Sequence, residues 1–481
     1  MPYLNQNIID IFSIGYVIAE WTIRIAMLIV VPLRRPPGSA RGWLVAALFI
    51  PIPALILYLL IGRPTYPRWR RKRFTKARQM LAIATDEINH SEFCSRPVLP
   101  DTYASASKLV ENLGQFPIMG GNKVNLLADY DGVIDELVAD INRARHHVHI
   151  LTYIFANDRT GSKIIEALKN AAERGVECRV LIDALGSRRW SRDIIDQLTS
   201  GGVQAARALP VTFLRRRSAR ADLRNHRKIA IIDSSHGFIG SQNIIDAQYA
   251  PGLFNRELVV HVAGPVVLEM QAVFAADWFL ETGQVLDEAT FFQHRHGAGS
   301  TTAQLLPSGP DYPVAGAGRL VVALIYSARR RIVITTPYFI PDVALVQALE
   351  TAVMRGVEVI LILSRASDSQ LVGLAQRSYY EQMLRAGIAI YLYPDGLLHA
   401  KHIMIDELIC VIGSTNIDIR SFQLNAEASL ILYDEKVANM LEAEQDKNIA
   451  ASDRLNRESW DQRPRPVKLV ENIARLVSPL L

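Results

Sequence analysis

Two segments of this 481-residue chain carry the same polar residues at the same spacing. The first is HRKIAIID (226–233) and the second is HAKHIMID (399–406). After six further residues the first is followed by GSQN (240–243) and the second by GSTN (413–416). Chance does not give two HxKxxxxD segments, each followed by GSxN at one spacing. The chain therefore contains a duplicated site.

The residue types suit chemistry at a phosphodiester. Side chains two apart on a strand share a face, so the histidine and lysine of each copy are expected to point into one cleft. One imidazole would attack phosphorus and the other would supply a proton, while ammonium and amide groups balance oxygen charge. No carboxylate cluster accompanies the motifs, so we expect no metal. The candidate residues are His226, Lys228, Ser241 and Asn243 in the first copy, and His399, Lys401, Ser414 and Asn416 in the second.

Four acidic residues occupy matching positions in the two copies. Asp233 and Asp406 end the motif strands, and we interpret them as structural supports. Glu257 in NREL and Glu427 in NAEA follow downstream, where a carboxylate can orient a histidine and keep the ring in the form needed for attack.

The elements around the motifs are also duplicated. HVHILTYIFAND (147–158) and RGVECRVLID (174–183) correspond to RIVITTPYFIPD (331–342) and RGVEVILIL (355–363). Apolar strand-like runs alternate with helical spacing, and glycine stands where each helix should stop. This predicts an α/β fold with mostly parallel sheets. Two similar halves, 119–295 and 296–481, would form a pseudo-twofold body with a site at their junction.

The N-terminal region is apolar and basic. Residues 11–33 and 43–61 each approach the length of a membrane span, so residues 1–63 are predicted to form a transmembrane hairpin. Glu20 and Arg24 lie four apart and can pair within the first span. No basic segment precedes that span, which argues against a signal peptide. The alternatives are an interfacial or re-entrant hairpin and two helices buried in a soluble core.

Charge distribution suggests the orientation. The chain has a net charge of +5, which divides into +10 for residues 1–78 and −5 for the rest. The basic segment within 64–118 places the body on the cytoplasmic side by the positive-inside rule, although arginines at 34, 35 and 41 argue the other way. The 49% hydrophobic content excludes a disordered chain, and three distant cysteines exclude a disulfide framework.

Three further patterns have competing interpretations. The arginines at 215, 216, 217, 220, 224 and 227 would attract an anionic lipid headgroup or, equally well, nucleic acid, or they would form a solvated face. The histidines at 146, 147 and 149 start a strand-like run without the carboxylates of a metal site. The apolar stripe Val467, Val470, Ile473, Ala474 and Val477 would either dock on the body or lie on a membrane.

The duplicated motif is similar to that of the phospholipase D superfamily. The apolar hairpin, DLRNHRK (222–228), PSGPD (307–311), TTPYFIPD (335–342) and LLHAKHIMID (397–406) resemble bacterial cardiolipin synthases over essentially the whole chain. The resemblance implies that two phosphatidylglycerol molecules become cardiolipin and glycerol without a nucleotide or metal cofactor. It also implies a multi-pass protein of the bacterial cytoplasmic (inner) membrane, acting on membrane lipids and not on nucleic acid.

The resemblance implies roles for the site residues. His226 would form a phosphatidyl-histidine intermediate, and His399 would protonate the departing glycerol and then deprotonate the acceptor hydroxyl; the two can exchange roles. Two alternatives keep the same residues: a phospholipase D that transfers to water, and a nuclease, which the membrane hairpin disfavours. The sequence leaves the acceptor, including phosphatidylethanolamine, and the oligomeric state open.

Overall fold

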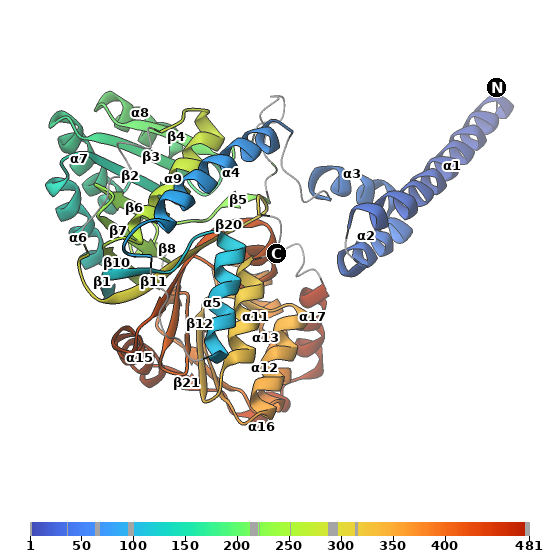
Figure 1. Cartoon of the computed structure of the whole chain (residues 1–481). Helices are drawn as coiled ribbons and strands as arrows, with labels where there is room; N and C mark the ends of the chain where they lie inside the picture. The colour runs from blue at the N-terminus through green and yellow to red at the C-terminus, as the bar shows by residue number, and fades with distance from the viewer. Residues whose placement is uncertain are drawn as a thin grey trace. The chain divides into compact units, whose positions relative to one another are not determined.

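The computed structural model of the protein describes residues 2–35, 37–62, 68–94, 101–211, 220, 222–250, 252–286, 297–312 and 316–476. These residues form two compact units (Figure 1). The N-terminal unit lies within residues 1–66, together with the short stretch 220–222. The remainder, which we call the body, contains both copies of the duplicated motif.

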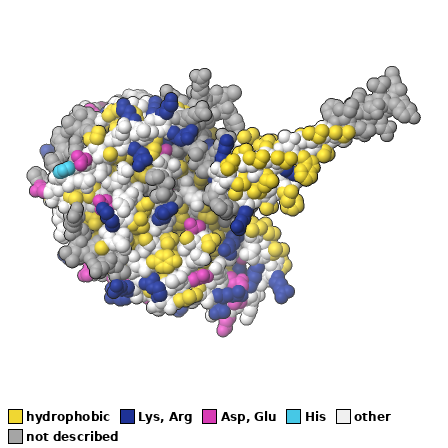
Figure 2. All heavy atoms as spheres, turned by 45° about the vertical axis from the view of Figure 1, so that its right-hand side comes forward, with side chains coloured by type: hydrophobic (Ala, Val, Ile, Leu, Met, Phe, Trp, Pro, Cys, Tyr) yellow, Lys and Arg dark blue, Asp and Glu magenta, His cyan; other side chains and the backbone are white. Residues whose placement is uncertain are grey.

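The N-terminal unit consists of three apolar helices, α1 (Pro2–Arg34), α2 (Pro37–Phe49) and α3 (Pro51–Ile61). Residues Ser13–Arg34 of α1 are long and apolar enough to cross a membrane. Trp43 and Tyr58 pack edge to face in the small core, with ring centroids 5.3 Å apart. Hydrophobic side chains also cover the outside of the unit (Figure 2), where lipid is their natural neighbour. The predicted pair of Arg24 and Glu20 is confirmed at 3.0 Å.

The second predicted span, residues 43–61, is not confirmed as one membrane-crossing helix. Helix α2 ends at Phe49 and α3 begins at Pro51, so the apolar run is divided between two shorter helices. Pro51 and Pro53 lack the backbone N–H that a continuous helix would use at those positions, which explains the break near Ile50.

The first half of the body begins with three strand–helix pairs and ends with a buried helix. Its elements are β1 (Met119–Leu127), α6 (Tyr130–Arg143), β2 (His147–Thr152), α7 (Arg159–Glu173), β3 (Glu177–Asp183), α8 (Ser191–Ser200), β4 (Gln204–Ala208), β5 (Arg224–Asn225), β6 (Ile229–Ile232), β7 (His236–Gly240), β8 (Gln248–Ala250), β9 (Leu253–Arg256), β10 (Val259–Ala263) and α9 (Val267–Thr282).

The second half repeats this order. Its elements are β11 (Thr301–Ser308), α11 (Gly316–Ser327), β12 (Arg331–Thr336), β13 (Phe339–Ile340), α12 (Val343–Met354), β14 (Glu358–Ser364), α13 (Gln370–Arg385), β15 (Ala389–Tyr393), β16 (Leu397–Leu398), β17 (His402–Ile405), β18 (Ile409–Gly413), β19 (Ile417–Asp418), α14 (Ile419–Gln423), β20 (Asn425–Tyr433), α15 (Glu435–Ala450), β21 (Asp453–Arg454), α16 (Arg457–Asp461) and α17 (Arg465–Leu476).

Local signals in the repeat explain matching helix boundaries. Asp158 and Asp342 end the two corresponding segments, and each caps the following helix by accepting a backbone N–H, from Gly161 and Leu345 respectively, at 2.9 Å. Gly175 and Gly356 follow α7 and α12 with φ of +87° and +83°. Glycine adopts this left-handed conformation without strain, so both helices stop where the sequence predicted.

The two halves share one continuous sheet. Its order is β21-β15-β14-β12-β17-β18-β20-β11-β1-β10-β7-β6-β2-β3-β4, so the halves join where β11 pairs with β1. The predicted α/β fold with two similar halves is confirmed. The expectation of mostly parallel sheets is wrong. Along this strand order only β2-β3-β4 and β12-β14-β15 are parallel. The motif strands return through tight hairpins, which require antiparallel pairing.

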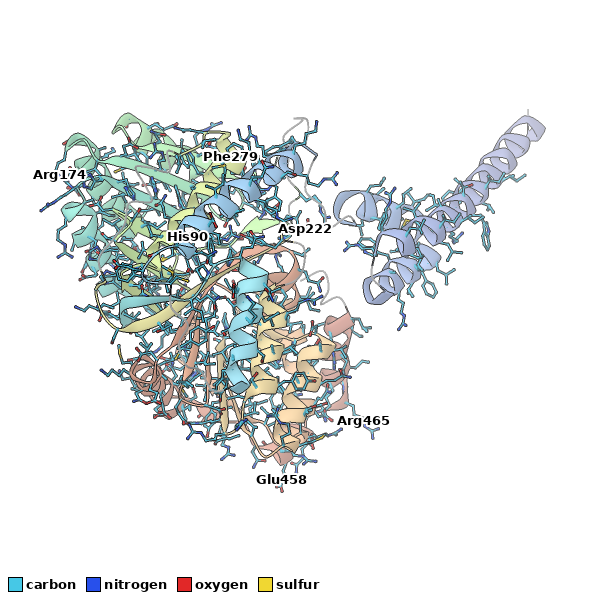
Figure 3. All side chains as sticks on the ribbon, in the orientation of Figure 1. His90, Arg174, Asp222, Phe279, Glu458 and Arg465 are labelled. Atoms are coloured by element: carbon cyan, nitrogen blue, oxygen red, sulfur yellow. The ribbon has the colours of Figure 1, made fainter. Side chains whose placement is uncertain are left out.

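Helices α4 (Arg68–Asn89) and α5 (Asp101–Gly114) lie between the N-terminal unit and the two halves in sequence, and both pack on the body. Helix α4 packs along α9, where Lys76 lies 5.5 Å above the ring of Phe279, a residue marked in Figure 3. Helix α5 packs against α11. Helix α9 is itself buried from Val267 to Leu280, so α4 covers the centre of the first half.

The C-terminal helix α17 docks on α13 through its less apolar face. Glu471 is buried and accepts ion pairs from Arg377 and Arg463, and Ala474 is buried beside it. Val470 and Ile473 are half exposed or more. Of the two alternatives left open for this segment, the structure shows docking on the body, while most of the apolar stripe points outward. Val477 lies outside the described residues.

Candidate active site

Exchange of short strands between the halves brings the two motifs together. Strand β5, directly before His226, pairs with β20 of the second half, and the N–H of His226 donates to the carbonyl of Ala426 at 2.8 Å. Strand β16, directly before His399, pairs with β9 of the first half, and the N–H of His399 donates to the carbonyl of Arg256 at 2.8 Å. Each histidine is thus anchored to the backbone of the opposite half.

The same exchange pairs each histidine with a glutamate of the other half. The Nδ1 atom of His226 lies 3.0 Å from both carboxylate oxygens of Glu427. The Nδ1 atom of His399 lies 2.7 Å from Oε1 of Glu257. Both glutamates are buried, and Ser414 donates its hydroxyl to Glu427 at 2.5 Å. The two predicted orienting carboxylates therefore contact histidines, each across the junction between halves.

These contacts set the protonation of the imidazoles. Burial lowers the pKa of His226 to about 4, although the carboxylate of Glu427 opposes that shift. Burial also lowers the pKa of His399 against the opposing effect of Glu257. A carboxylate only accepts hydrogen bonds, so a neutral ring here carries its proton on Nδ1. The lone pair of Nε2 is then available to a substrate.

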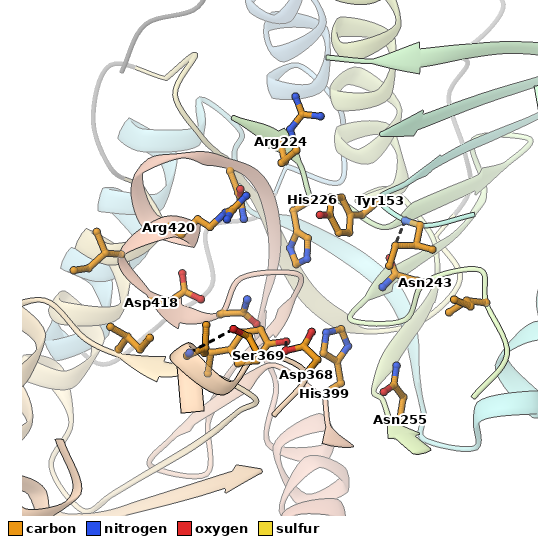
Figure 4. Close-up of a pocket in the computed structure, with 18 residues that line it drawn as sticks. Tyr153, Arg224, His226, Asn243, Asn255, Asp368, Ser369, His399, Asp418 and Arg420 are labelled. Atoms are coloured by element: carbon orange, nitrogen blue, oxygen red, sulfur yellow. Dashed lines mark hydrogen bonds between the residues drawn. The ribbon is translucent and has the colours of Figure 1, made fainter. Parts of the chain in front are cut away.

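The two histidines line a cavity of about 360 Å³ (Figure 4). Asn243 and Asn416 of the GSxN segments line it with them. The Oδ1 atom of Asn243 accepts the N–H of Ile154 at 3.1 Å, which leaves its amide nitrogen as a donor. A cavity of this volume is at the low end for ligand pockets and suits polar headgroups better than acyl chains. Predicted residues from both halves therefore meet in one cavity.

The two motif lysines are buried beside the cavity and are not part of its lining. Lys228 donates to the carbonyl of its own histidine at 2.7 Å, and Lys401 donates to the carbonyl of His399 at 2.5 Å. Burial lowers the pKa of Lys228 to about 7 and that of Lys401 to about 8. We expected the histidine and the lysine of each copy to point into one cleft. This is wrong for the lysines, because both ammonium groups are held by backbone carbonyls beside the cavity.

The two motif aspartates hold turns away from the cavity. Asp233 and Asp406 have φ of +50° and +52° in the tight turns after β6 and β17. The carboxylate of Asp406 accepts the backbone N–H groups of residues 329, 330 and 331 at 2.7–2.8 Å. Asp233 accepts those of residues 145, 146 and 147 at 2.8–2.9 Å. Each aspartate thus fixes the start of a neighbouring central strand.

The arginines near the first motif are not all available to lipid. Arg224 is 1% exposed and pairs with Asp183 at 3.1 Å, and Arg227 is 3% exposed and pairs with Asp277 at 2.5 Å. Arg220 pairs with Asp222. The prediction of a lipid-attracting cluster is therefore wrong for Arg224 and Arg227, because buried acidic partners neutralise them. Residues 215–217 lie outside the described residues.

The histidines at 147 and 149 have structural partners. His147 lies 3.0 Å from the hydroxyl of Ser234, and His149 lies 3.0 Å from Gln271 and stacks on Phe274. In the part of the chain that the structure describes, one group has metal-ligand geometry, namely Glu136, Asp140 and His261. Arg143 already pairs with Asp140 at 2.5 Å, and this group does not line the cavity.

Sequence reasoning missed several cavity residues. The ring of Tyr153 meets that of His226 edge to face at 4.9 Å and lies 5.3 Å from the ammonium of Lys228. Asp368, which accepts the hydroxyl of Tyr338 at 2.7 Å, and Arg420 also line the cavity. Tyr153 lies in a repeated segment, but its counterpart by alignment is Pro337, so the repeat gave no signal.

Comparisons with known proteins identify a family that matches both halves. A family model described as "Cardiolipin synthase, PLD-like domain" matches residues 137–278 and 321–448, one segment in each half. Cardiolipin synthase A of Serratia proteamaculans (strain 568) is 32% identical over 484 residues, covering 98% of each chain. Cardiolipin synthase A of Citrobacter koseri is 33% identical over 486 residues, covering 97% of each chain.

Solved structures show the same fold. A phosphatidylserine synthase of Haemophilus influenzae superimposes with a TM-score of 0.61 at 15% identity, covering 78% of this chain and all of that one. A polyphosphate kinase of Porphyromonas gingivalis superimposes with a TM-score of 0.50 at 15% identity, covering 80% of this chain and 57% of that one. Both likenesses concern the architecture.

Proposed function

The chain belongs to the family of PLD-like cardiolipin synthases, and from that premise we propose that it converts two phosphatidylglycerol molecules into cardiolipin and glycerol. The observation that carries the proposal is the convergence of two buried histidines, each oriented by a glutamate of the opposite half, in one cavity. Such a pair supplies a nucleophile and a proton donor for a phosphatidyltransferase.

In the first step, Nε2 of His226 attacks the phosphorus of the donor lipid. The bond from phosphorus to the glycerol oxygen breaks. His399 enters this step as the imidazolium, with Glu257 as its counter-ion, and gives its Nε2 proton to that oxygen, so glycerol leaves as a neutral alcohol. The strongly lowered pKa of His226 favours the neutral ring that attack requires. Glu427 stabilises the cationic phosphatidyl-histidine that forms.

In the second step, the now neutral His399 removes the proton from the terminal hydroxyl of the second phosphatidylglycerol. Its oxygen attacks phosphorus, the phosphorus–nitrogen bond breaks, and His226 is regenerated as cardiolipin leaves. Asn243 and Asn416 line the cavity and would donate to the phosphoryl oxygens. Lys228 and Lys401 would lend positive charge from beside the cavity.

We place the reaction at the bacterial cytoplasmic membrane. In this proposal residues 1–63 form the anchor, 64–118 join it to the two halves, and 119–295 and 296–481 are those halves. The apolar helix α1 supports membrane association. We also propose that residues 43–61 cross the membrane and that the body lies on its cytoplasmic side. Cysteine labelling of intact cells and of inverted vesicles, with single cysteines in α17, would test the orientation.

The deciding experiment is incubation of the detergent-purified full chain with phosphatidylglycerol as the sole lipid. Cardiolipin and free glycerol should appear in equal amounts. Phosphatidic acid without cardiolipin would instead identify a phospholipase D that transfers to water. A requirement for a CDP-activated lipid would contradict the mechanism.

A further inference from the structure

The two halves line the cavity differently beyond their matching histidines and asparagines. Two and four residues after Asn243 stand Ile245 and Ala247, whereas the corresponding positions after Asn416 hold Asp418 and Arg420. Ile245, Asp418 and Arg420 all line the cavity. At these positions the first half is apolar and the second half is charged, although the catalytic groups are duplicated.

Arg420 brings positive charge to this wall. It lies on the short helix α14, and Figure 4 shows its side chain in the cavity on the same wall as Asp418. The carboxylate of Asp418 is engaged with the start of α14, where Oδ1 accepts the N–H of Ser421 at 2.6 Å. Within the described residues, no acidic oxygen lies within 4.0 Å of the Arg420 guanidinium, unlike Arg224, which Asp183 neutralises at 3.1 Å.

The proposed reaction brings a second anion into the cavity. The phosphoryl group under attack is served by both histidines, both asparagines and the adjacent lysines. The acceptor phosphatidylglycerol carries a phosphodiester of its own, separated from the reacting hydroxyl by the three carbons of its glycerol. That group has to lie close to the reaction centre, where lysines held by backbone carbonyls are not exposed to it.

Resting on the proposed function, we propose that Arg420 binds the phosphodiester of the acceptor lipid and so makes an anionic phospholipid the preferred acceptor. A guanidinium presents a planar set of donors that matches two phosphate oxygens, and it keeps its charge at any physiological pH. The first half has Ala247 at the equivalent position, and its cavity-lining arginine, Arg224, is already paired with Asp183 at 3.1 Å. The asymmetry gives the two lipids different places in an otherwise duplicated site.

The test compares two acceptors with one donor. The full-length protein is incubated with phosphatidylglycerol and isotope-labelled glycerol, and two products are measured together. Cardiolipin reports transfer to a phosphate-bearing acceptor, and labelled phosphatidylglycerol reports transfer to an acceptor without phosphate. Both products require the same donor and the same histidines.

Arg420→Gln should lower cardiolipin formation about tenfold to a hundredfold, the loss expected when one charge-assisted phosphate contact is removed. Glycerol exchange should stay within about twofold of the wild-type rate, because that acceptor makes no such contact. The rate of cardiolipin formation by Arg420→Lys should lie between those of the wild type and Arg420→Gln. The control is Arg319→Gln, which removes an exposed arginine of α11, and it should change neither product.

Equal loss of both products in a folded Arg420→Gln protein, verified by thermal unfolding, would overturn the proposal, since Arg420 would then serve the donor or both lipids. Loss of neither product would overturn it as well. Failure of the wild-type protein to form cardiolipin while it still exchanges glycerol would reject the proposed function itself. Because that result comes from the wild-type protein alone, it can be distinguished from a failure of the proposal for Arg420.

Discussion

The guanidinium of Arg70, in the first turn of α4, is ion-paired with the carboxylate of Glu281, in the last turn of α9. The Arg70 side chain is 1% exposed, and its other nitrogen lies 3.3 Å from Asp311. The helix that follows the apolar N-terminal unit in sequence is therefore attached to the body by a buried ion pair.

Glu281→Gln should destabilise the body. Removing one partner of a buried ion pair leaves a charge poorly compensated, which typically costs about 3–5 kcal/mol, with Asp311 retaining part of the interaction here. Thermal or denaturant unfolding of the detergent-solubilised protein measures the loss. Asp131→Asn is the matched control, because its pair with Arg159 is exposed and should be worth less than about 1 kcal/mol. Equal stability of the two variants would contradict this account of α4.

A donor with a good leaving group should separate the roles of the histidines. Phosphatidyl-p-nitrophenol releases p-nitrophenolate without needing a proton, so His399→Ala should still give a burst equal to the enzyme concentration. His226→Ala should give no burst, because the phosphorus–nitrogen bond cannot form. Rapid-mixing absorbance measures both. The reverse pattern would show that His399 is the nucleophile.

Activity should fall as pH rises through about 7 to 8. Burial lowers the pKa of Lys228 to about 7 and that of Lys401 to about 8, and each lysine is charged only below its pKa. Loss of that charge removes positive potential beside the phosphoryl group. This fall in activity is measured as kcat/KM for cardiolipin formation across pH 5 to 10 at constant ionic strength. A guanidinium does not titrate in this range. In Lys228→Arg only Lys401 would still lose its charge, so the pH at which activity falls should move towards the pKa of Lys401. A flat profile to pH 10 would exclude a role for lysine charge.

Asp406→Asn should cost stability and leave the chemistry intact. Asparagine tolerates the positive φ of this turn. Its NH₂ group, however, would face the backbone N–H groups that the carboxylate now accepts. We therefore expect the folded state to lose about 2–3 kcal/mol of charge-assisted hydrogen bonding. Although burial opposes them, Tyr103 and the backbone N–H groups hold the pKa of Asp406 below its usual value. That stabilisation is present above the unfolded pKa of about 3.8 and disappears as pH falls through the folded pKa.

Denaturation curves at pH 7 and pH 3, together with kcat at pH 7, test this assignment. The variant should be less stable than the wild type at pH 7, and the difference should shrink at pH 3. A large loss of kcat with unchanged stability would instead make Asp406 a participant in proton transfer.

The duplicated motif predicted which residues meet, since His226, His399, Asn243 and Asn416 all line one cavity. It did not predict the partners. Glu257 and Glu427 stand at matching positions, and sequence spacing fits pairing within a half as well as between halves. The pairing is decided by β5 joining β20 and β16 joining β9, contacts between residues far apart in sequence.

Charge was the least predictable property. Arg224, Arg227 and Arg420 look alike in the sequence, yet the first two are buried against aspartates, whereas Arg420 lines the cavity with no such ion pair among the described residues. Exposure depends on which acidic residues the fold places nearby. The apolar run 43–61 shows a similar limit, because its length predicted one span while its prolines divided the helix.

The crossed histidine–glutamate contacts also have a consequence for biosynthesis. His226 leaves the ribosome 201 residues ahead of Glu427, its orienting partner. While the chain is being made, the nascent polypeptide already carries its apolar N-terminal helix and its first histidine, yet it has no assembled site. The site can therefore assemble only when translation has nearly finished, and a product terminated before Glu427 would lack the carboxylate that orients His226.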